Sequence, residues 1–199
     1  MARLILTMLL VGLHVCTCVV VDFKTAGGVP GETSDHSTIK ANTALLERTV
    51  NSFKSGDTLI ISNETFVVTG NIILENLTDV TIQIDGTLSF SDDIKHWPKE
   101  SDGETYATAL TINNTTNLLI TSTGKGTLDG NGATWWGIPY VGYLERGKNR
   151  PPLLNVNYAT GFIMEHILLL NSPRFHFTSS YLRQATIRHV NAGPRRETT

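Results

Sequence analysis

Two six-residue segments late in the chain repeat each other at an offset of 23 residues. Residues 162–167 (FIMEHI) align with residues 185–190 (ATIRHV), so that Met164 meets Ile187. A unit of this length cannot bury its apolar side alone, and neighbouring copies stack to form one continuous core. We therefore predict an all-β solenoid, a parallel β-helix in which each rung stacks on the next.

The middle of the chain supplies the short strands that such a coil needs. Apolar, β-prone runs, several of them separated by Asn or Gly, lie at residues 58–61, 66–68, 71–74, 80–84 and 87–90. The apolar centres Ile82, Ile120 and Met164 are 38 and 44 residues apart. These longer steps contain segments 94–105 and 130–150, which we expect to be loops inserted between rungs, the first of them on the surface.

Residues 126–137 (GTLDGNGATWWG) read as a short strand, a glycine-rich bend and two adjacent tryptophans. Glycines accept the positive φ angles that sharp reversals require. We expect Trp135 and Trp136 to pack against the coil. The alternative is that they stack on a sugar, although adjacent residues of an extended chain point in opposite directions.

Residues 37–52 form the one segment with convincing helical periodicity. Ile39, Leu46, Val50 and Phe53 recur near helical spacing. We expect this amphipathic helix to cap the N-terminal end of the stack, where strand edges would otherwise be free to pair with other chains.

The N-terminus has the pattern of a secretory signal peptide, with Arg3, an apolar core at 4–13 and small residues before Cys18. We expect cleavage near Cys18, giving a signal peptide at 1–21 and a secreted, extracellular β-helix domain at 22–199 with no membrane anchor. The alternative is an uncleaved signal anchor, for which the apolar core is short. Cleavage would remove both cysteines of the chain, and with them any disulfide or cysteine–zinc site.

Four sequons agree with secretion, because Asn-X-Ser/Thr is the acceptor for N-glycans in exported proteins. The candidate glycosylation sites are Asn63, Asn76, Asn113 and Asn114. Each signal is weak in a chain rich in Thr and Asn, and the adjacent pair is not expected to carry two glycans.

The charge is unevenly distributed. From Gly147 onward the chain has seven arginines or lysines and two glutamates, a formal charge of +5 in a chain whose total is −2. A basic region attracts anionic partners, and a polyanionic polysaccharide would qualify. The alternative is an ordinary solvated surface. No nucleic-acid-binding motif is present, and the arginines are spread out rather than clustered.

The 23-residue register also brings polar residues together. It places His166 above His189 where a strand turns into the next, and His is enriched among non-glycine residues in left-handed turns. We interpret them as stacked turn residues. The alternative, a two-histidine metal site, lacks a third ligand, so we assign no metal and no cofactor. The same register predicts an exposed ion pair between Glu165 and Arg188.

Three segments, in order, carry a resemblance to a known family. Residues 126–136 resemble the G-x-[IL]-D-G-x-G-x-x-W-W segment of the polygalacturonase family of glycoside hydrolases, family twenty-eight. Residues 150–154 (RPPLL) resemble its R-P-x-L/M segment, and residues 170–177 (LNSPRFHF) its N-S-P-x-[FW]-[HT] segment. The resemblance implies a right-handed parallel β-helix, secretion, and a pectin-like, anionic polysaccharide as substrate.

The family's catalytic segments follow its N-S-P segment, and no N-T-D or G-H-G segment occurs in this chain. Inverting glycosidases need two carboxyl groups about 6.5–9.5 Å apart. We assign no catalytic residue, because the candidates lie in turns or loops of early rungs: Asp79, Asp85, Asp92, Asp93, Asp102 and Asp129. We expect the N-terminal part of a hydrolase, truncated on its C-terminal side and inactive alone. The alternative is a non-catalytic secreted β-helix that binds polysaccharide or is structural. The exact sugar, endo or exo action, and oligomeric state are not predicted.

Overall fold

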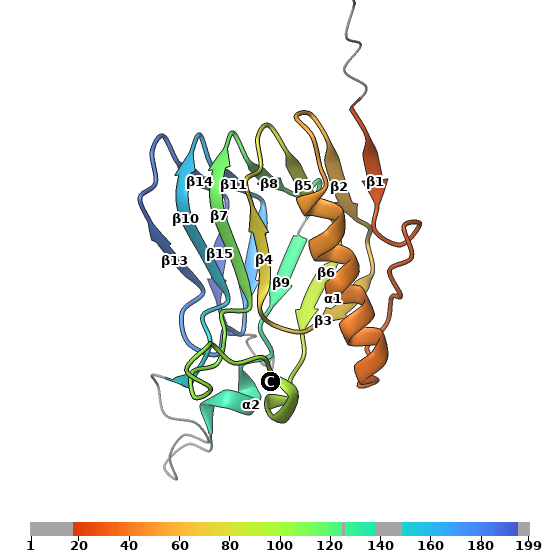
Figure 1. Ribbon diagram of the computed structural model, residues 1–199, viewed down its shortest axis with the longest axis vertical. Helices are drawn as coiled ribbons and strands as arrows, with labels where there is room; N and C mark the ends of the chain where they lie inside the picture. The colour runs from red at the N-terminus through yellow and green to blue at the C-terminus, as the bar shows by residue number, and fades with distance from the viewer. Residues whose placement is uncertain (1–17, 125, 138–148, 195–199) are drawn as a thin grey trace, which may run out of the picture.

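The computed structural model describes residues 18–124, 126–137 and 149–194, which wind into a right-handed parallel β-helix (Figure 1). Its strands lie in three sheets. The six-stranded sheet contains β1 (Val20–Asp22), β2 (Thr58–Ile61), β5 (Thr81–Ile84), β8 (Leu119–Thr121), β11 (Ile163–Glu165) and β14 (Thr186–Arg188). The five-stranded sheet contains β3 (Thr65–Val68), β6 (Thr87–Phe90), β9 (Gly126–Asp129), β12 (Ile167–Leu170) and β15 (Asn191–Gly193). The four-stranded sheet contains β4 (Ile72–Glu75), β7 (Leu110–Thr116), β10 (Leu154–Thr160) and β13 (Phe177–Ser180).

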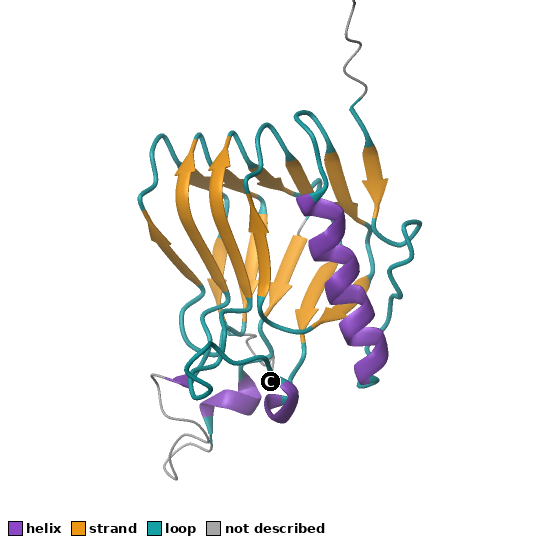
Figure 2. Cartoon of the chain, in the orientation of Figure 1, coloured by secondary structure: helices purple, strands orange, loops and turns teal. Residues whose placement is uncertain are grey.

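From β2 onward the chain visits the three sheets in rotation, so each full turn of the coil adds one parallel strand to each sheet (Figure 2). Met164 pairs with Ile187 on one side and with Ile120 on the other, and Ile120 pairs with Ile82. The predicted register is therefore confirmed for the repeat of 23 residues and for both longer steps.

The core follows from this register, because residues at equivalent positions stack inside the coil. Leu59, Ile82, Ile120 and Met164 form one such column and are all buried. Burying each of these side chains contributes about 1.5–3 kcal/mol. The next member, Ile187 on the edge strand β14, is 46% exposed because it is covered from one side only.

The helix α1 (His36–Asn51) closes the N-terminal end of the coil, as expected, and lies against β3 and β4. Asp35 caps it by accepting a hydrogen bond from the Thr38 N–H. Two side chains of the helix bond the edge backbone of β4: Asn51 Oδ1 accepts from Glu75 N at 3.0 Å, and Glu47 Oε1 accepts from Ile73 N at 3.0 Å. The helix thereby satisfies an edge that could otherwise pair with another chain.

The two insertions carry short helices, η1 (Ile94–His96) and α2 (Ala133–Trp136). The first is not the purely surface loop that its charges predicted. Trp97 within it is 3% exposed, and its Nε1–H donates to the Ala107 carbonyl at 2.9 Å. Trp135 is fully buried, with its ring 5.5 Å from Trp97 and 4.9 Å from Tyr106. The predicted packing of Trp135 against the coil is confirmed. No helix in the part of the chain described here is long and apolar enough to cross a membrane.

Candidate functional site

The motif residues on either side of α2 hold two rungs together. Asp129 is buried, and its Oδ1 accepts hydrogen bonds from Asn131 N at 3.0 Å and Asn171 Nδ2 at 3.1 Å. A Cβ atom added to Gly132 would lie 2.5 Å from the Asn171 carbonyl oxygen, so only glycine fits there. Trp136 Nε1 donates to the Ser172 carbonyl at 3.0 Å. These contacts make the D-G-N-G and N-S-P segments one structural unit, and Asp129 a structural residue.

The stacked histidines occupy left-handed turns, as predicted. His166 has φ 57° and His189 has φ 53°, and their rings lie 5.0 Å apart at an angle of 10°. Arg188 donates to the Glu165 carboxylate at 2.6 Å, which confirms the expected ion pair and holds the pKa of Glu165 below its usual value. These stacked turn residues therefore have a structural role.

A second column of left-handed turn residues joins the four-stranded sheet to the six-stranded sheet. Asn76, Asn114, Tyr158 and Tyr181 all have φ between 52° and 58° and lie at successive positions of the register. Asn114 Nδ2 donates to Asn76 Oδ1 at 2.6 Å. The tyrosine rings continue the column, stacked 4.7 Å apart at an angle of 7°. The column thus changes from amide side chains to aromatic rings toward the basic region that begins at Gly147.

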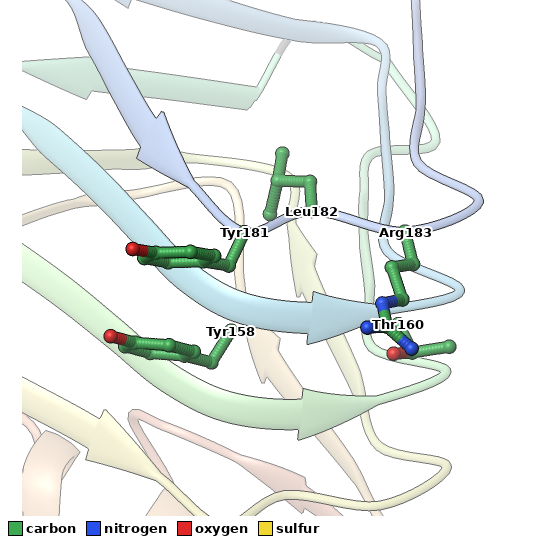
Figure 3. Close-up of a pocket in the computed structure, with 5 residues that line it drawn as sticks. All are labelled: Tyr158, Thr160, Tyr181, Leu182 and Arg183. Atoms are coloured by element: carbon green, nitrogen blue, oxygen red, sulfur yellow. The ribbon is translucent and has the colours of Figure 1, made fainter.

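The two tyrosines line an open pocket of about 510 Å³ together with Thr160, Leu182 and Arg183 (Figure 3). Tyr158 is 59% exposed and Tyr181 is 72% exposed, so their rings present a broad apolar surface to solvent. Among the residues that the structure describes, the Arg183 guanidinium forms no salt bridge. In Figure 3 the guanidinium lies near Thr160 and the rings extend away from it, so the pocket has an aromatic and a cationic part, which together can hold an anionic sugar.

Sequence reasoning did not select these tyrosines, although a signal was present. Tyr158 and Tyr181 stand at the same 23-residue offset as Met164 and Ile187. Aromatic residues repeated at the period of the coil predict a stacked column on its surface. Among the described basic residues after Gly147, Arg183 is the one that lines this pocket.

The sequon asparagines occupy different environments. Asn63 is exposed in the turn between β2 and β3. Asn76 and Asn114 are exposed but bond each other, and Asn113 Oδ1 accepts from Asn157 Nδ2 at 3.1 Å. Asn63 is therefore the sequon asparagine whose side chain lies outside these columns.

Hydrogen bonds stabilise the charged form of several of the candidate aspartates. Hydrogen bonds from Asn117 and Ser55 lower the pKa of Asp79, and hydrogen bonds from Thr105 lower the pKa of Asp102. Burial acts to raise the pKa of Asp85, but hydrogen bonds from neighbouring polar groups hold it below its usual value. A general acid in a glycosidase needs a raised pKa.

The doublet Asp92–Asp93 lies in the loop after β6 and precedes the N-S-P segment. Asp93 contacts His36 and His96. The described residues thus contain a polar scaffold and a candidate binding pocket.

Comparison with known proteins gives a consistent assignment. The family model described as glycosyl hydrolases family 28 matches residues 57–195. The chain is 31% identical over 120 residues to the alpha-L-rhamnosidase rgxB of Aspergillus niger, covering 59% of this chain and 28% of the relative. It is 26% identical over 160 residues to exopolygalacturonase A of Aspergillus niger, covering 77% of this chain and 36% of the relative.

A solved structure shares the fold. The hyperthermoactive exopolygalacturonase from Thermotoga maritima aligns with a TM-score of 0.64 at 16% identity, over 88% of this chain and 47% of that chain. The present chain thus spans roughly a third of the length of the two curated relatives.

Proposed function

Because the chain belongs to glycosyl hydrolases family 28, we propose that it forms the N-terminal rungs of a secreted protein that acts on a pectin-like, anionic polysaccharide. The observation that carries this proposal is the exposed pair Tyr158 and Tyr181, which lines one pocket with Arg183. The stacked rings offer their exposed edges to sugar rings, and the guanidinium offers a bidentate partner for a uronate carboxylate.

Hydrolysis itself requires more than these rungs. Inverting hydrolysis needs a pair of carboxyl groups, one of them with a raised pKa, whereas the pKa values of Asp79, Asp85 and Asp102 are lowered. We propose that further rungs of a longer protein stack on β13, β14 and β15 and supply that pair. The half-exposed Ile187 on β14 supports this, since its buried counterpart Met164 is covered from both sides.

Sugar binding is tested with substitutions that the left-handed turns at Tyr158 and Tyr181 can accept. Asn occupies the same left-handed positions at Asn76 and Asn114, so Tyr158→Asn with Tyr181→Asn should keep the backbone while removing both rings. We expect this double variant to bind oligogalacturonate at least about tenfold more weakly, which corresponds to about 1.4 kcal/mol. Arg183→Gln should weaken binding and reduce its dependence on salt.

The matched control is Arg174→Gln, because Arg174 belongs to the same basic region but stacks on Phe175 instead of lining the pocket. Its affinity should stay within about twofold of the parent chain. Equal losses in Arg174→Gln and Arg183→Gln would show a diffuse charge effect and refute the pocket. An alpha-L-rhamnoside run beside polygalacturonate distinguishes the two substrate types that the names of the relatives indicate.

Catalysis is tested separately from binding. Reducing-sugar release by this chain should equal that of a heat-killed control, whereas a longer chain continuing through an Asn-Thr-Asp segment should be active. Turnover by the short chain would reveal a catalytic pair among its early aspartates. Binding without turnover in both chains would favour the second candidate, a non-catalytic polysaccharide-binding β-helix, which the pocket also supports.

We also propose that the signal peptide is cleaved between Cys18 and Val19, three residues before the boundary at 21 that the sequence pattern predicted, because β1 begins at Val20. Val19 N lies 2.8 Å from Asp57 Oδ1, and the Asp57 side chain is buried. Backbone N–H groups of Lys54 and Val19 hold the pKa of Asp57 below its usual value, so the carboxylate is charged. Cleavage there would place a new ammonium group against this carboxylate and leave β1 intact.

Mass spectrometry of secreted protein should give Val19 as the N-terminus and a glycan on Asn63, the sequon asparagine outside the turn columns. An N-terminus at Asp22 would remove Val20 and Val21 from β1, and its observation would refute this cleavage site. Retention of Met1 would refute export with cleavage.

A further inference from the structure

Three side chains with metal-binding atoms meet between α1 and the loop that follows β6. The atoms His36 Nε2, Asp93 Oδ2 and His96 Nδ1 lie within 4.8 Å of one another. Asp93 Oδ2 is 3.2 Å from His36 Nε2 and 2.9 Å from His96 Nδ1. A tetrahedral ion bound at about 2.1 Å requires ligand atoms about 3.4 Å apart. The ligand atoms therefore stand close to the spacing that an ion needs.

Local structure holds each ligand in place. His36 is the first residue of α1, where the Asp35 cap fixes the turn. Asp93 caps η1 through its Oδ1, which accepts from Lys95 N at 3.0 Å, so its Oδ2 is left for the two histidines. The rings of His36 and His96 pack at 3.8 Å with an angle of 75°.

The His36 nitrogen has an unusual environment. Its Nε2 is buried and lies 3.2 Å from Asp93 Oδ2, without hydrogen-bond geometry to any described residue, although buried polar atoms normally make such a bond. It borders a small pocket of about 60 Å³ that Asp93, His96 and Lys40 also line. A buried nitrogen aimed into a pocket with two further donors is typical of a ligand whose partner is an ion.

We propose that His36, Asp93 and His96 bind a divalent ion of the zinc class, with a water molecule as fourth ligand. Two imidazoles and one carboxylate suit zinc, cobalt or nickel, whereas calcium and magnesium require mostly oxygen ligands. Binding is to neutral imidazoles, so it weakens as the histidines become protonated. The Lys40 ammonium opposes the ion and limits its affinity.

The ion would fasten the N-terminal cap to the second rung. His36 belongs to α1, whereas Asp93 and His96 belong to the insertion after β6, and the two segments are far apart in the sequence. A ligand that binds only the folded state stabilises that state by mass action. Zinc should therefore raise the melting temperature and slow opening of α1 from the strands that it covers.

The experiment titrates the full chain, as secreted, with zinc alone and with cobalt as a spectroscopic probe. We expect one ion per chain and cobalt absorption bands of tetrahedral type. His36→Gln, Asp93→Asn and His96→Gln should each weaken zinc binding at least about tenfold and abolish the zinc-dependent rise in melting temperature. Lys40→Ala should bind zinc more tightly.

His189→Gln is the matched control, because His189 stacks on His166 without a third ligand. It should leave the zinc affinity unchanged. His96 is exposed, so His96→Gln provides the test even if His36→Gln fails to fold. Absence of saturable zinc binding, unchanged affinity in His96→Gln, or loss of binding in His189→Gln would each overturn the proposal.

Discussion

The two adjacent tryptophans offer a sharp test of the architecture, because the structure assigns them different roles. Trp135 is fully buried between Trp97 and Tyr106, with both rings nearly perpendicular to its own. Its Nε1 has no hydrogen-bond partner within the part of the chain that the structure describes. Trp136 is half-buried, and its Nε1 donates to the Ser172 carbonyl. Substitutions at the two positions should therefore differ in size and in cause.

The magnitudes follow from what each substitution removes. Trp135→Ala leaves a cavity and should cost about 3–5 kcal/mol. Trp135→Phe keeps an aromatic ring and loses no hydrogen bond at Nε1, so we expect about 1–2 kcal/mol, from lost volume and weaker edge-to-face contacts. Trp136→Phe loses one hydrogen bond and should cost about 0.5–1.5 kcal/mol.

The assay is urea unfolding followed by far-ultraviolet circular dichroism, which reports the sheets independently of tryptophan fluorescence. For a chain of this size, Trp135→Ala should lower the melting temperature by roughly 6–20 °C. Oligogalacturonate affinity of the folded Trp135→Phe variant should be unchanged. A Trp135→Ala variant within about 1 kcal/mol of the parent chain, or a selective loss of sugar binding in Trp135→Phe, would refute the packing role.

Two further predictions concern the turns and the carboxylates. His166→Asn or His166→Gly should be nearly neutral in urea unfolding, whereas His166→Val should cost about 1–2 kcal/mol, because φ is 57° there and a β-branched residue resists it. Acid should destabilise the chain, because the pKa values of Glu165 and Asp79 are lowered in the folded state. This stability is present above the unfolded pKa values and is lost as pH falls through the folded ones, so melting temperatures should drop below about pH 4. Glu165→Gln, which lacks one of these carboxyls, should lose less stability on acidification, and an equal loss would contradict the assignment.

Features that recur once per turn of the coil could be predicted from the sequence, because residues at equivalent positions of successive rungs have the same environment. Met164 and Ile187 occupy one inward position of successive rungs, so their pairing followed from the alignment of two segments. The same alignment placed His166 and His189 in left-handed turns. The stacked tyrosines obey the same offset, but their role depends on exposure, which a period alone does not specify.

Features carried by insertions were harder to predict, because an insertion has no second copy against which to align it. Trp97 lies among charged residues that are typical of a surface loop, yet its indole fills the end of the core beside Trp135. The side chains of α1 that bond the edge of β4 belong to the polar face that helical periodicity assigns to solvent. In both cases tertiary contacts, rather than local pattern, decide the environment.

The His36, Asp93 and His96 cluster could not be predicted from the sequence, because its ligands come from an insertion and from the capping helix, and neither segment repeats. A zinc motif that can be read from sequence usually pairs ligands at short spacing, such as histidines one helical turn apart. Here Asp93 is the N-cap of η1 and His96 is its last residue, but the third ligand comes from the helix that caps the coil. One ligand comes from α1 and two come from the insertion after β6. The three ligands therefore come together only when α1 is docked on the rung that carries this insertion. Zinc binding is therefore expected to report docking of the cap, and a chain whose α1 is displaced should lose zinc affinity while its inner rungs remain folded.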